Sequence, residues 1–260
     1  MNERERIALD ALKSSKKYGG ICPQAVDRIF AEELNKHAKL KDADKSARAR
    51  LHQITGAFMT PDQLKKAGKC LDAYVQGDES ALQSALKLHA STAERIEHIG
   101  ELYAHVFEIT GKPALILDLA CGLNPLYLGS MGLRVIGYDI SGDAVALVNA
   151  WAEMCKWAVR AEVADLSEDT ARPPADLTLM MKLLPVLEQQ RKGAGMALLS
   201  SAPSHHQLTT FPTRTLSGRG VGMELNYTRW FEDNLPDTHR IIGRFVIAHE
   251  LCYITEDAHA

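Results

Sequence analysis

Three aspartates, each at the end of an apolar run, are the residues of this chain best placed to do chemistry together: Asp118, Asp139 and Asp165. If the three runs are neighbouring parallel strands, the carboxylates meet at the carboxyl edge of the sheet, where open α/β sheets bind ligands. Asp139 lies about twenty residues after Asp118, a spacing typical of an acid that accepts hydrogen bonds from a ribose diol. Each aspartate taken alone is equally consistent with a helix cap or a solvated strand end. Together they predict a site for a nucleotide-like ligand.

The sequence of the turn after Asp118 favours one class of nucleotide-like ligand over another. A dinucleotide site normally has Gly-x-Gly-x-x-Gly, because each glycine lets backbone approach a pyrophosphate or lets a helix pack on a strand. This chain has Ala120, Cys121 and Gly122 there. A turn that need not hold two phosphates tolerates such side chains, so S-adenosylmethionine (SAM) fits better than NAD. We expect Asp118 near the amino and sulfonium end of SAM, Asp139 at the ribose and Asp165 at the adenine amino group.

The residue after the fourth apolar run indicates the methyl acceptor. Methylases of exocyclic amines commonly place an Asp/Asn-Pro-Pro-aromatic run there, whereas this chain has Met181-Lys182-Leu183-Leu184-Pro185. A ring nitrogen such as guanine N7 already presents a lone pair, so it needs in-line placement but no general base. Lys182 could then hold guanine O6 or a neighbouring phosphate. A lysine that extends along the surface into water explains the same position.

Positive charge is unevenly distributed. The net charge of −3 argues against a uniformly basic coat, yet ten Lys and Arg face five acids between Lys13 and Arg50. Such a patch suits a phosphate backbone, and so do Arg214 and Arg219 in a glycine-rich segment. A solvated helical face or a long connection gives the same patterns. Arg95, on the segment that leads into the sheet, is able to meet the cofactor carboxylate in bidentate fashion.

The elements that position these residues fall into two parts. Residues 1–110 read as helical, with a capping-box pattern at Thr60-Pro61-Asp62-Gln63, and we expect them to form an all-helical domain. Residues 111–260 alternate apolar strand candidates with helices, which predicts an α/β domain with a mostly parallel sheet. The strand candidates begin at Pro113, Leu133, Arg160, Asp176, Gln207, His239 and His249, and the last two form an antiparallel pair.

Composition excludes several classes of protein. A chain of 260 residues with 46% hydrophobic content can bury a full core. Its five cysteines form no Cys-x-x-Cys pair, so neither a zinc site nor a disulfide framework is indicated, and we expect no metal and a reducing cytoplasm. No apolar run approaches the roughly eighteen residues of a membrane span, so we expect no membrane partner.

Four separated segments of the chain closely resemble the aminoglycoside-resistance 16S rRNA (guanine-N7) methyltransferases. They are Leu88–Arg95, Asp118–Leu126, Lys182–Pro185 and Phe211–Glu224, and the shorter segments Ser15–Tyr18 and Arg50–His52 are similar as well. The resemblance covers nearly the whole chain. It implies a class I SAM-dependent methyltransferase fold, Rossmann-like with a seven-stranded sheet. It also implies that the helical domain docks on the assembled 30S subunit and that one decoding-site guanine is methylated, which gives resistance to 4,6-disubstituted deoxystreptamines.

The resemblance also assigns site residues. The implied SAM-binding residues are His89, Ala90, Ser91, Arg95, Ala120, Gly122, Asp139, Asp165, Leu166, Met181 and Gln190. With the basic segments above, the expected RNA contacts are Lys16, Lys17, Arg50, Lys182, Arg214 and Arg219. We expect a monomer. The residues leave open methylation of a nearby adenine at N1, a small-molecule methyltransferase with a helical lid, and a non-catalytic RNA-binding module.

Overall fold

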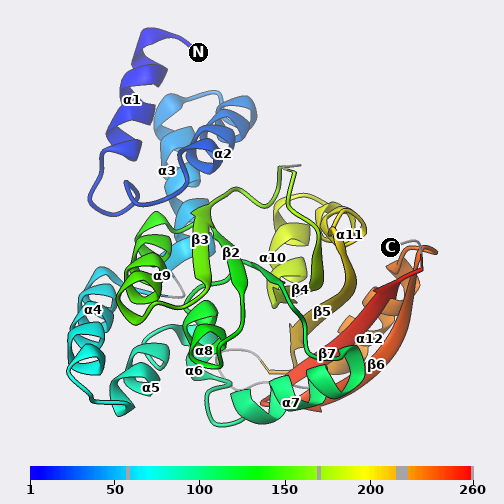
Figure 1. Ribbon diagram of the computed structural model, residues 1–260. Coiled ribbons are helices and arrows are strands. Elements are labelled where there is room, and N and C mark those ends of the chain that lie inside the picture. Colours follow the sequence, from blue (N-terminus) through cyan, green and yellow to red (C-terminus); the bar gives the residue numbers. More distant parts are fainter. Residues whose placement is uncertain (57–58, 169–170, 215–221, 259–260) are drawn as a thin grey trace.

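The computed structural model describes residues 1–56, 59–168, 171–214 and 222–258. The first three helices, α1 (Glu3–Lys13), α2 (Pro23–Lys36) and α3 (Leu40–Leu51), form a bundle set apart from the rest of the chain (Figure 1). The π-helical turn η1 (His52–Gly56) follows α3 directly. This bundle has its own hydrophobic core, which includes the fully buried Leu12, Ile29, Phe30 and Leu51. We call residues 1–56 the α1–α3 unit.

Three of the next four helices belong to a different core. The four are α4 (Pro61–Val75), α5 (Ser80–Leu86), α6 (Ala90–Ala93) and α7 (Ile99–Thr110). α4 begins with the expected capping box, in which Gln63 N donates to Thr60 Oγ1 (3.3 Å) and Thr60 N donates to Gln63 Oε1 (2.8 Å). Buried residues of α4, α5 and α7 pack in one cluster with residues of the sheet. Packing therefore divides the helical segment 1–110 near residue 56 and not at its end.

A seven-stranded sheet forms the centre of the larger body, in the order β3-β2-β1-β4-β5-β7-β6. The strands are β1 (Ile116–Leu119), β2 (Val135–Asp139), β3 (Val159–Val163), β4 (Ala175–Met181), β5 (Ser204–Pro212), β6 (His239–Ile247) and β7 (Glu250–Asp257). The first five pair in parallel, and β7 pairs antiparallel with β5 and β6. The expected mostly parallel sheet and its antiparallel terminal pair are confirmed.

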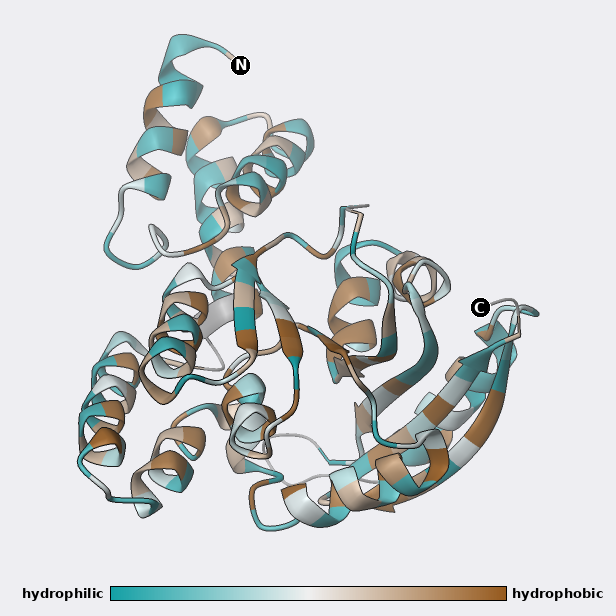
Figure 2. Ribbon diagram, viewed as in Figure 1, coloured by the Kyte–Doolittle hydropathy of each residue, from teal (hydrophilic) through white to brown (hydrophobic). Residues whose placement is uncertain are grey.

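Helices cover both faces of the sheet. They are α8 (Asn124–Ser130), α9 (Gly142–Cys155), α10 (Leu183–Gln190), α11 (Ala194–Ser200) and α12 (Met223–Asn234). Successive residues of β1 belong to opposite cores, because Ile116 packs with one cluster and Leu117 with the other. Figure 2 shows hydrophobic residues in the central strands and mostly hydrophilic residues on α1–α3. Within the described ranges, no helix is both long and apolar enough to cross a membrane.

Candidate active site

A cleft lies at the carboxyl ends of β1 to β4 and contains about 920 Å³ of empty space, part of which is open to solvent. Eight of the eleven expected SAM-binding residues line it, as does Lys182: His89, Ser91, Ala120, Asp139, Asp165, Leu166, Met181 and Gln190. Ala90, Arg95 and Gly122 do not line the cleft. The sequence reading missed several lining residues, among them Ile54, Met59, Ile140, Ser141 and Val186. These are ordinary apolar or small residues, and no motif marks them.

Asp139 is held rigidly at the end of β2. Its Oδ1 accepts a hydrogen bond from Ser141 N (2.8 Å), and its Oδ2 accepts one from Gly122 N (2.8 Å). Burial raises the pKa of this carboxyl above its usual value. A carboxylate offers about four acceptor sites in all, more than these backbone donors use, so Asp139 can still accept from a ligand. Such an acceptor suits a ribose diol.

Two non-glycine residues with left-handed backbone follow neighbouring strands. Ala120 after β1 has φ 60°, and Lys182 after β4 has φ 56°. Such conformations cost about 1 kcal/mol or more, and they concentrate at functional sites. Both residues line the cleft. The chain therefore turns sharply at two adjacent strand ends, which opens the space between them.

Gly122 packs closely against His89, which lines the cleft. It has φ 50°, and a Cβ there would lie 2.5 Å from Cε1 of His89. No other residue type fits both the backbone and the imidazole. Burial, with a smaller contribution from the charge of Arg95, lowers the pKa of His89 to about 4, so the ring is neutral at physiological pH. His89 thus contributes an uncharged surface to the cleft.

Arg95 lies behind the cleft and is buried in an ion pair that no sequence motif predicted. Its Nε donates to Glu250 Oε1 (3.0 Å) and its Nη2 to Ser91 Oγ (2.9 Å). Glu250, at the start of β7, also accepts from Thr210 Oγ1 (2.7 Å). We expected Arg95 to hold a cofactor carboxylate; its guanidinium is paired with Glu250 here, and that role stays a prediction. No local motif marks Glu250, because only the β5–β7 pairing brings it here.

Lys182 shares the carboxylate of Glu250 with Arg95. Its Nζ lies 3.1 Å from Glu250 Oε1 and also pairs with Glu94. The side chain is 15% exposed. The two carboxylates compensate Lys182 and Arg95, so this group of four charges has no net charge. Lys182 therefore reaches the cleft as a donor whose charge is already balanced.

Asp118 does not line the cleft. It is 1% exposed and accepts a hydrogen bond from Asn124 Nδ2 (2.6 Å), and Asn124 Oδ1 accepts from Tyr103 Oη (2.9 Å). Burial raises the pKa of Asp118 to about 7. The structure places this aspartate in a polar network beneath the turn, not at the amino end of the cleft where we expected it.

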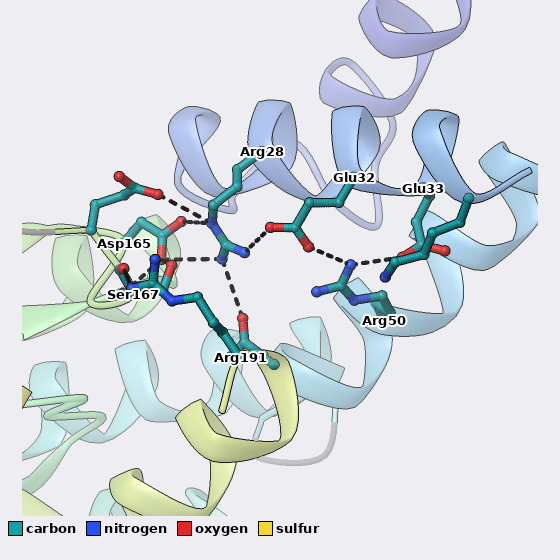
Figure 3. Close-up of polar contacts among 10 residues, drawn as sticks. Arg28, Glu32, Glu33, Arg50, Asp165, Ser167 and Arg191 are labelled. Carbon is teal, nitrogen blue, oxygen red and sulfur yellow. Dashed lines mark hydrogen bonds and ion pairs between the residues drawn. The ribbon is translucent and has the colours of Figure 1, made fainter. Parts of the chain in front are cut away.

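Asp165 is paired with an arginine from the α1–α3 unit. Nε of Arg28 lies 2.8 Å from Asp165 Oδ2, and Nη2 lies 3.3 Å from Oδ1. The same Nη2 donates to Gln190 Oε1 (3.2 Å). In Figure 3, Arg28 extends from α2 toward Asp165. Arg28 also pairs with Glu32, which in turn pairs with Arg50. Although burial opposes it, hydrogen bonds from Arg28 and Ser167 lower the pKa of Asp165, which is therefore ionised.

The expected RNA contacts lie in different surroundings. Lys16 and Lys17 are exposed on the loop after α1, and Arg214 is exposed beside His249. Arg50 is paired instead, because its Nη1 lies 2.7 Å from both Glu32 Oε2 and Glu33 Oε1. Arg219 lies outside the described residues.

One cluster has the spacing of metal ligands. In the described part of the chain it consists of His205, His206 and Glu256, on β5 and β7. None of the three lines the cleft. The carboxylate of Glu256 is also paired with Arg240, which is a cation already in place. Glu256 and Arg240 form an ion pair between β7 and β6, and the cluster lies away from the cleft.

Comparison with known proteins adds to this geometry. Residues 14–254 match the model of the FmrO ribosomal RNA methyltransferase family. The 16S rRNA (guanine(1405)-N(7))-methyltransferase of Serratia marcescens is 41% identical over 251 residues, which cover 95% of this chain and 96% of that protein. The enzyme of the same name from Micromonospora echinospora is 35% identical over 258 residues, covering 95% of this chain and 94% of that protein.

Solved structures agree along the whole chain. The 16S rRNA methyltransferase RmtF, crystallised with S-adenosyl-L-homocysteine, superposes with a TM-score of 0.94 at 50% identity, covering 99% of both chains. The 16S rRNA methylase RmtB superposes with a TM-score of 0.88 at 36% identity and covers 99% of this chain and 100% of its own. Fold, cleft and sequence therefore agree, and this chain belongs to the FmrO family of ribosomal RNA methyltransferases.

Proposed function

We propose that this protein transfers the methyl group of SAM to N7 of guanine 1405 in 16S rRNA, within the assembled 30S subunit. The observation that carries the proposal is the cleft at the strand ends, with Asp139 and Asp165 on one wall and Lys182 on the other. Full-length similarity to proteins named for this reaction supports the choice of base.

The residues present suit SAM. Asp139 keeps acceptor sites for a ribose diol, and Asp165 with Gln190 offers polar groups to an adenine edge. When bound, SAM supplies an electrophilic methyl group on a sulfonium. The lone pair of guanine N7 forms the new N–C bond as the C–S bond breaks, so the positive charge passes from sulfur to the base. No proton moves, and the chain need supply no general base.

Lys182 is the residue that we place against the target nucleotide, at guanine O6 or a phosphate. An unbalanced cation close to N7 would oppose the positive charge that develops on the base. Glu94 and Glu250 balance Lys182 and thereby reduce this repulsion. Lys182 can then position the nucleotide by hydrogen bonding.

The RNA-facing surface comprises the helical N-terminal region and the mouth of the cleft. Lys16 and Lys17 are exposed and available to phosphates, and so is Arg214. Arg50 would have to leave Glu32 and Glu33 to reach RNA, so its assignment stays a prediction. We infer a monomer acting in the cytoplasm, where 30S subunits are found. A methyl group on N7 would remove an acceptor and add bulk and charge at the aminoglycoside site, which would give the expected resistance.

The test is to incubate the protein with labelled SAM and 30S subunits, free 16S rRNA or a metabolite pool. We expect label only with 30S subunits and, after borohydride reduction and aniline treatment, chain cleavage at guanine 1405. A reverse-transcription stop at a nearby adenine without aniline would indicate N1 methylation instead. Label in small molecules alone would overturn the ribosomal assignment.

A matched pair of lysines tests the role of Lys182. Lys182→Met should lose methyl transfer by about a hundredfold or more while S-adenosyl-L-homocysteine (SAH) binding changes little. Lys156→Met is the control, because Lys156 is also a lysine with φ 56°, is exposed at the end of α9 and does not line the cleft. Equal rates in the two variants would contradict the placement of Lys182.

A further inference from the structure

Two residues that line the cleft beside β3 are held from behind by a residue of another folding unit. Arg28 lies on α2, within the α1–α3 unit, yet its guanidinium ends between Asp165 and Gln190 of the sheet-bearing body. Its side chain is only 17% exposed. Glu168 also lies near its Nε, at 3.8 Å. The side chain of Arg28 therefore links the position of α2 to the lining of the cleft.

Ser167 and Arg28 together decide which oxygen of Asp165 can accept from a ligand. Oδ1 already accepts from Ser167 N (3.0 Å), Ser167 Oγ (2.6 Å) and Arg28 Nη2 (3.3 Å). Among the described residues, Oδ2 accepts a hydrogen bond only from Arg28 Nε (2.8 Å). A carboxylate oxygen has about two acceptor sites, so the remaining one is on Oδ2. The planar guanidinium fixes the rotation of the carboxylate that presents it.

Arg28 also fixes the amide of Gln190. A guanidinium only donates hydrogen bonds, so the amide must turn its Oε1 toward Nη2 of Arg28. The amide nitrogen of Gln190, a residue that lines the cleft, then remains as a donor. Adenine presents an amino donor beside a ring-nitrogen acceptor, which is the complement of Asp165 Oδ2 and Gln190 Nε2. Arg28 thus sets the acceptor and donor that read the base.

The α1–α3 unit touches the cleft wall at a second place. Cys22 N donates to Ile140 O (2.8 Å), and Gly142 N donates to Gly20 O (2.6 Å). Ile140 lines the cleft directly after Asp139. In the other direction, ion pairs lead from Arg28 through Glu32 to Arg50 on α3 (Figure 3). A shift of the α1–α3 unit would therefore move cleft residues at both the ribose position and the adenine position.

We propose that Arg28 is a positioning residue for the adenine end of the cleft, and that it couples SAM binding to docking of the α1–α3 unit on ribosomal RNA. The second half rests on the proposed function. A ligand that stabilises one placement of the unit also favours any partner that binds the same placement. The coupling is reciprocal, so SAM and the subunit change each other's affinity by the same factor.

The first experiment needs no ribosome. Calorimetry measures the Kd of SAH for the wild type, Arg28→Ala, Arg28→Lys and the control Arg48→Ala, whose partner Asp44 lies within α3. We expect about a tenfold weaker Kd for Arg28→Ala and little recovery with lysine, which lacks the fork. Arg48→Ala should bind as the wild type does. Asp165→Asn combined with Arg28→Ala should lose less than the sum of the two single losses. A Kd for Arg28→Ala within twofold of the wild type, with its urea midpoint unchanged, would overturn the positioning role.

The second experiment measures 30S affinity with and without saturating SAH. We expect the wild type to bind at least fivefold more tightly with SAH, within the usual range of coupling. For Arg28→Ala the ratio should approach one. An identical ratio in both proteins, or a wild-type ratio of one, would overturn the coupling. If the wild type binds no subunit at all, the proposed function fails, and the SAH arm still decides whether Arg28 positions the cleft.

Discussion

The two sides of the cleft are built by different means. On the β4 side, Arg95, Glu250 and Lys182 form a buried charge cluster within the body that contains the sheet. On the β3 side, the carboxylate of Asp165 is paired with Arg28 from the α1–α3 unit, which has its own hydrophobic core. The β4 side therefore belongs to one folding unit, whereas the β3 side depends on how two units sit together. In the proposed function, methyl transfer takes place on the β4 side and the adenine of SAM binds on the β3 side.

A substitution that breaks the charge cluster on the β4 side should lower the stability of the whole protein. Glu250→Gln removes the charge that pairs with Arg95, which is 2% exposed and has no route to water. An uncompensated buried charge costs about 3–5 kcal/mol. We expect the free energy of unfolding in urea to fall by that amount, with loss of activity as a consequence. Glu256→Gln, on the same strand and paired with Arg240 near the surface, is the control and should lose far less. Similar losses in both variants would mean that the β4 side is not a buried cluster.

The buried network beneath the cleft should show itself in the pH dependence of stability. Burial raises the pKa of Asp118 to about 7, so between about pH 4 and 7 the folded protein holds a proton that the unfolded chain has lost. This contribution to stability therefore falls as the pH rises through that window. Asp118→Asn removes the titration and should gain on the order of 1–3 kcal/mol relative to the wild type between pH 5 and pH 8. Urea unfolding at the two pH values measures this, with the exposed Asp62→Asn as the control. A constant difference between mutant and wild type would contradict it.

Asp139 lies between the two sides and should affect the ligand more than the fold. Asp139→Ala removes the acceptors that we assign to the ribose and leaves Gly122 N and Ser141 N without their partner. We expect SAH to bind at least about tenfold more weakly, equivalent to about 1.4 kcal/mol. Calorimetry with Glu162→Ala, on the exposed part of β3, provides the comparison. Unchanged SAH affinity would remove Asp139 from the site.

The smallest effect should come from the surface of the α1–α3 unit. Charge reversal at Lys16 and Lys17 should weaken 30S binding and reduce its dependence on salt, by roughly one unit of slope for each phosphate that the protein no longer neutralises. Lys65 and Lys66 form a matched exposed pair on α4, which packs with the sheet. Their reversal should leave the slope unchanged if docking belongs to the α1–α3 unit. An equal change for both pairs would extend the docking surface to the whole helical segment 1–110.

Local pattern was sufficient for most of the fold. Continuous apolar runs predicted the strands, because a strand buried on both faces can carry little else. Two helices were not anticipated. α11 has only seven residues, and α12 buries only Phe231, so neither shows a clear apolar periodicity. The division of the helical region near residue 56 was also missed, since periodicity shows that a helix has an apolar face but not which core receives it.

By itself the sequence determined the strand-end acids, the turn at Gly122 and the family, because these depend on residues close together in the chain or on motifs read whole. Only the tertiary structure decided the partners of the charges. Arg95 meets Glu250 across 155 positions, and Arg28 meets Asp165 across 137. A buried charge takes whichever opposite charge the fold brings within a few ångströms, and sequence separation says nothing about that distance. For this reason Arg28 read as one cation in a basic patch, although the structure pairs it with Asp165 and Gln190, which line the cleft.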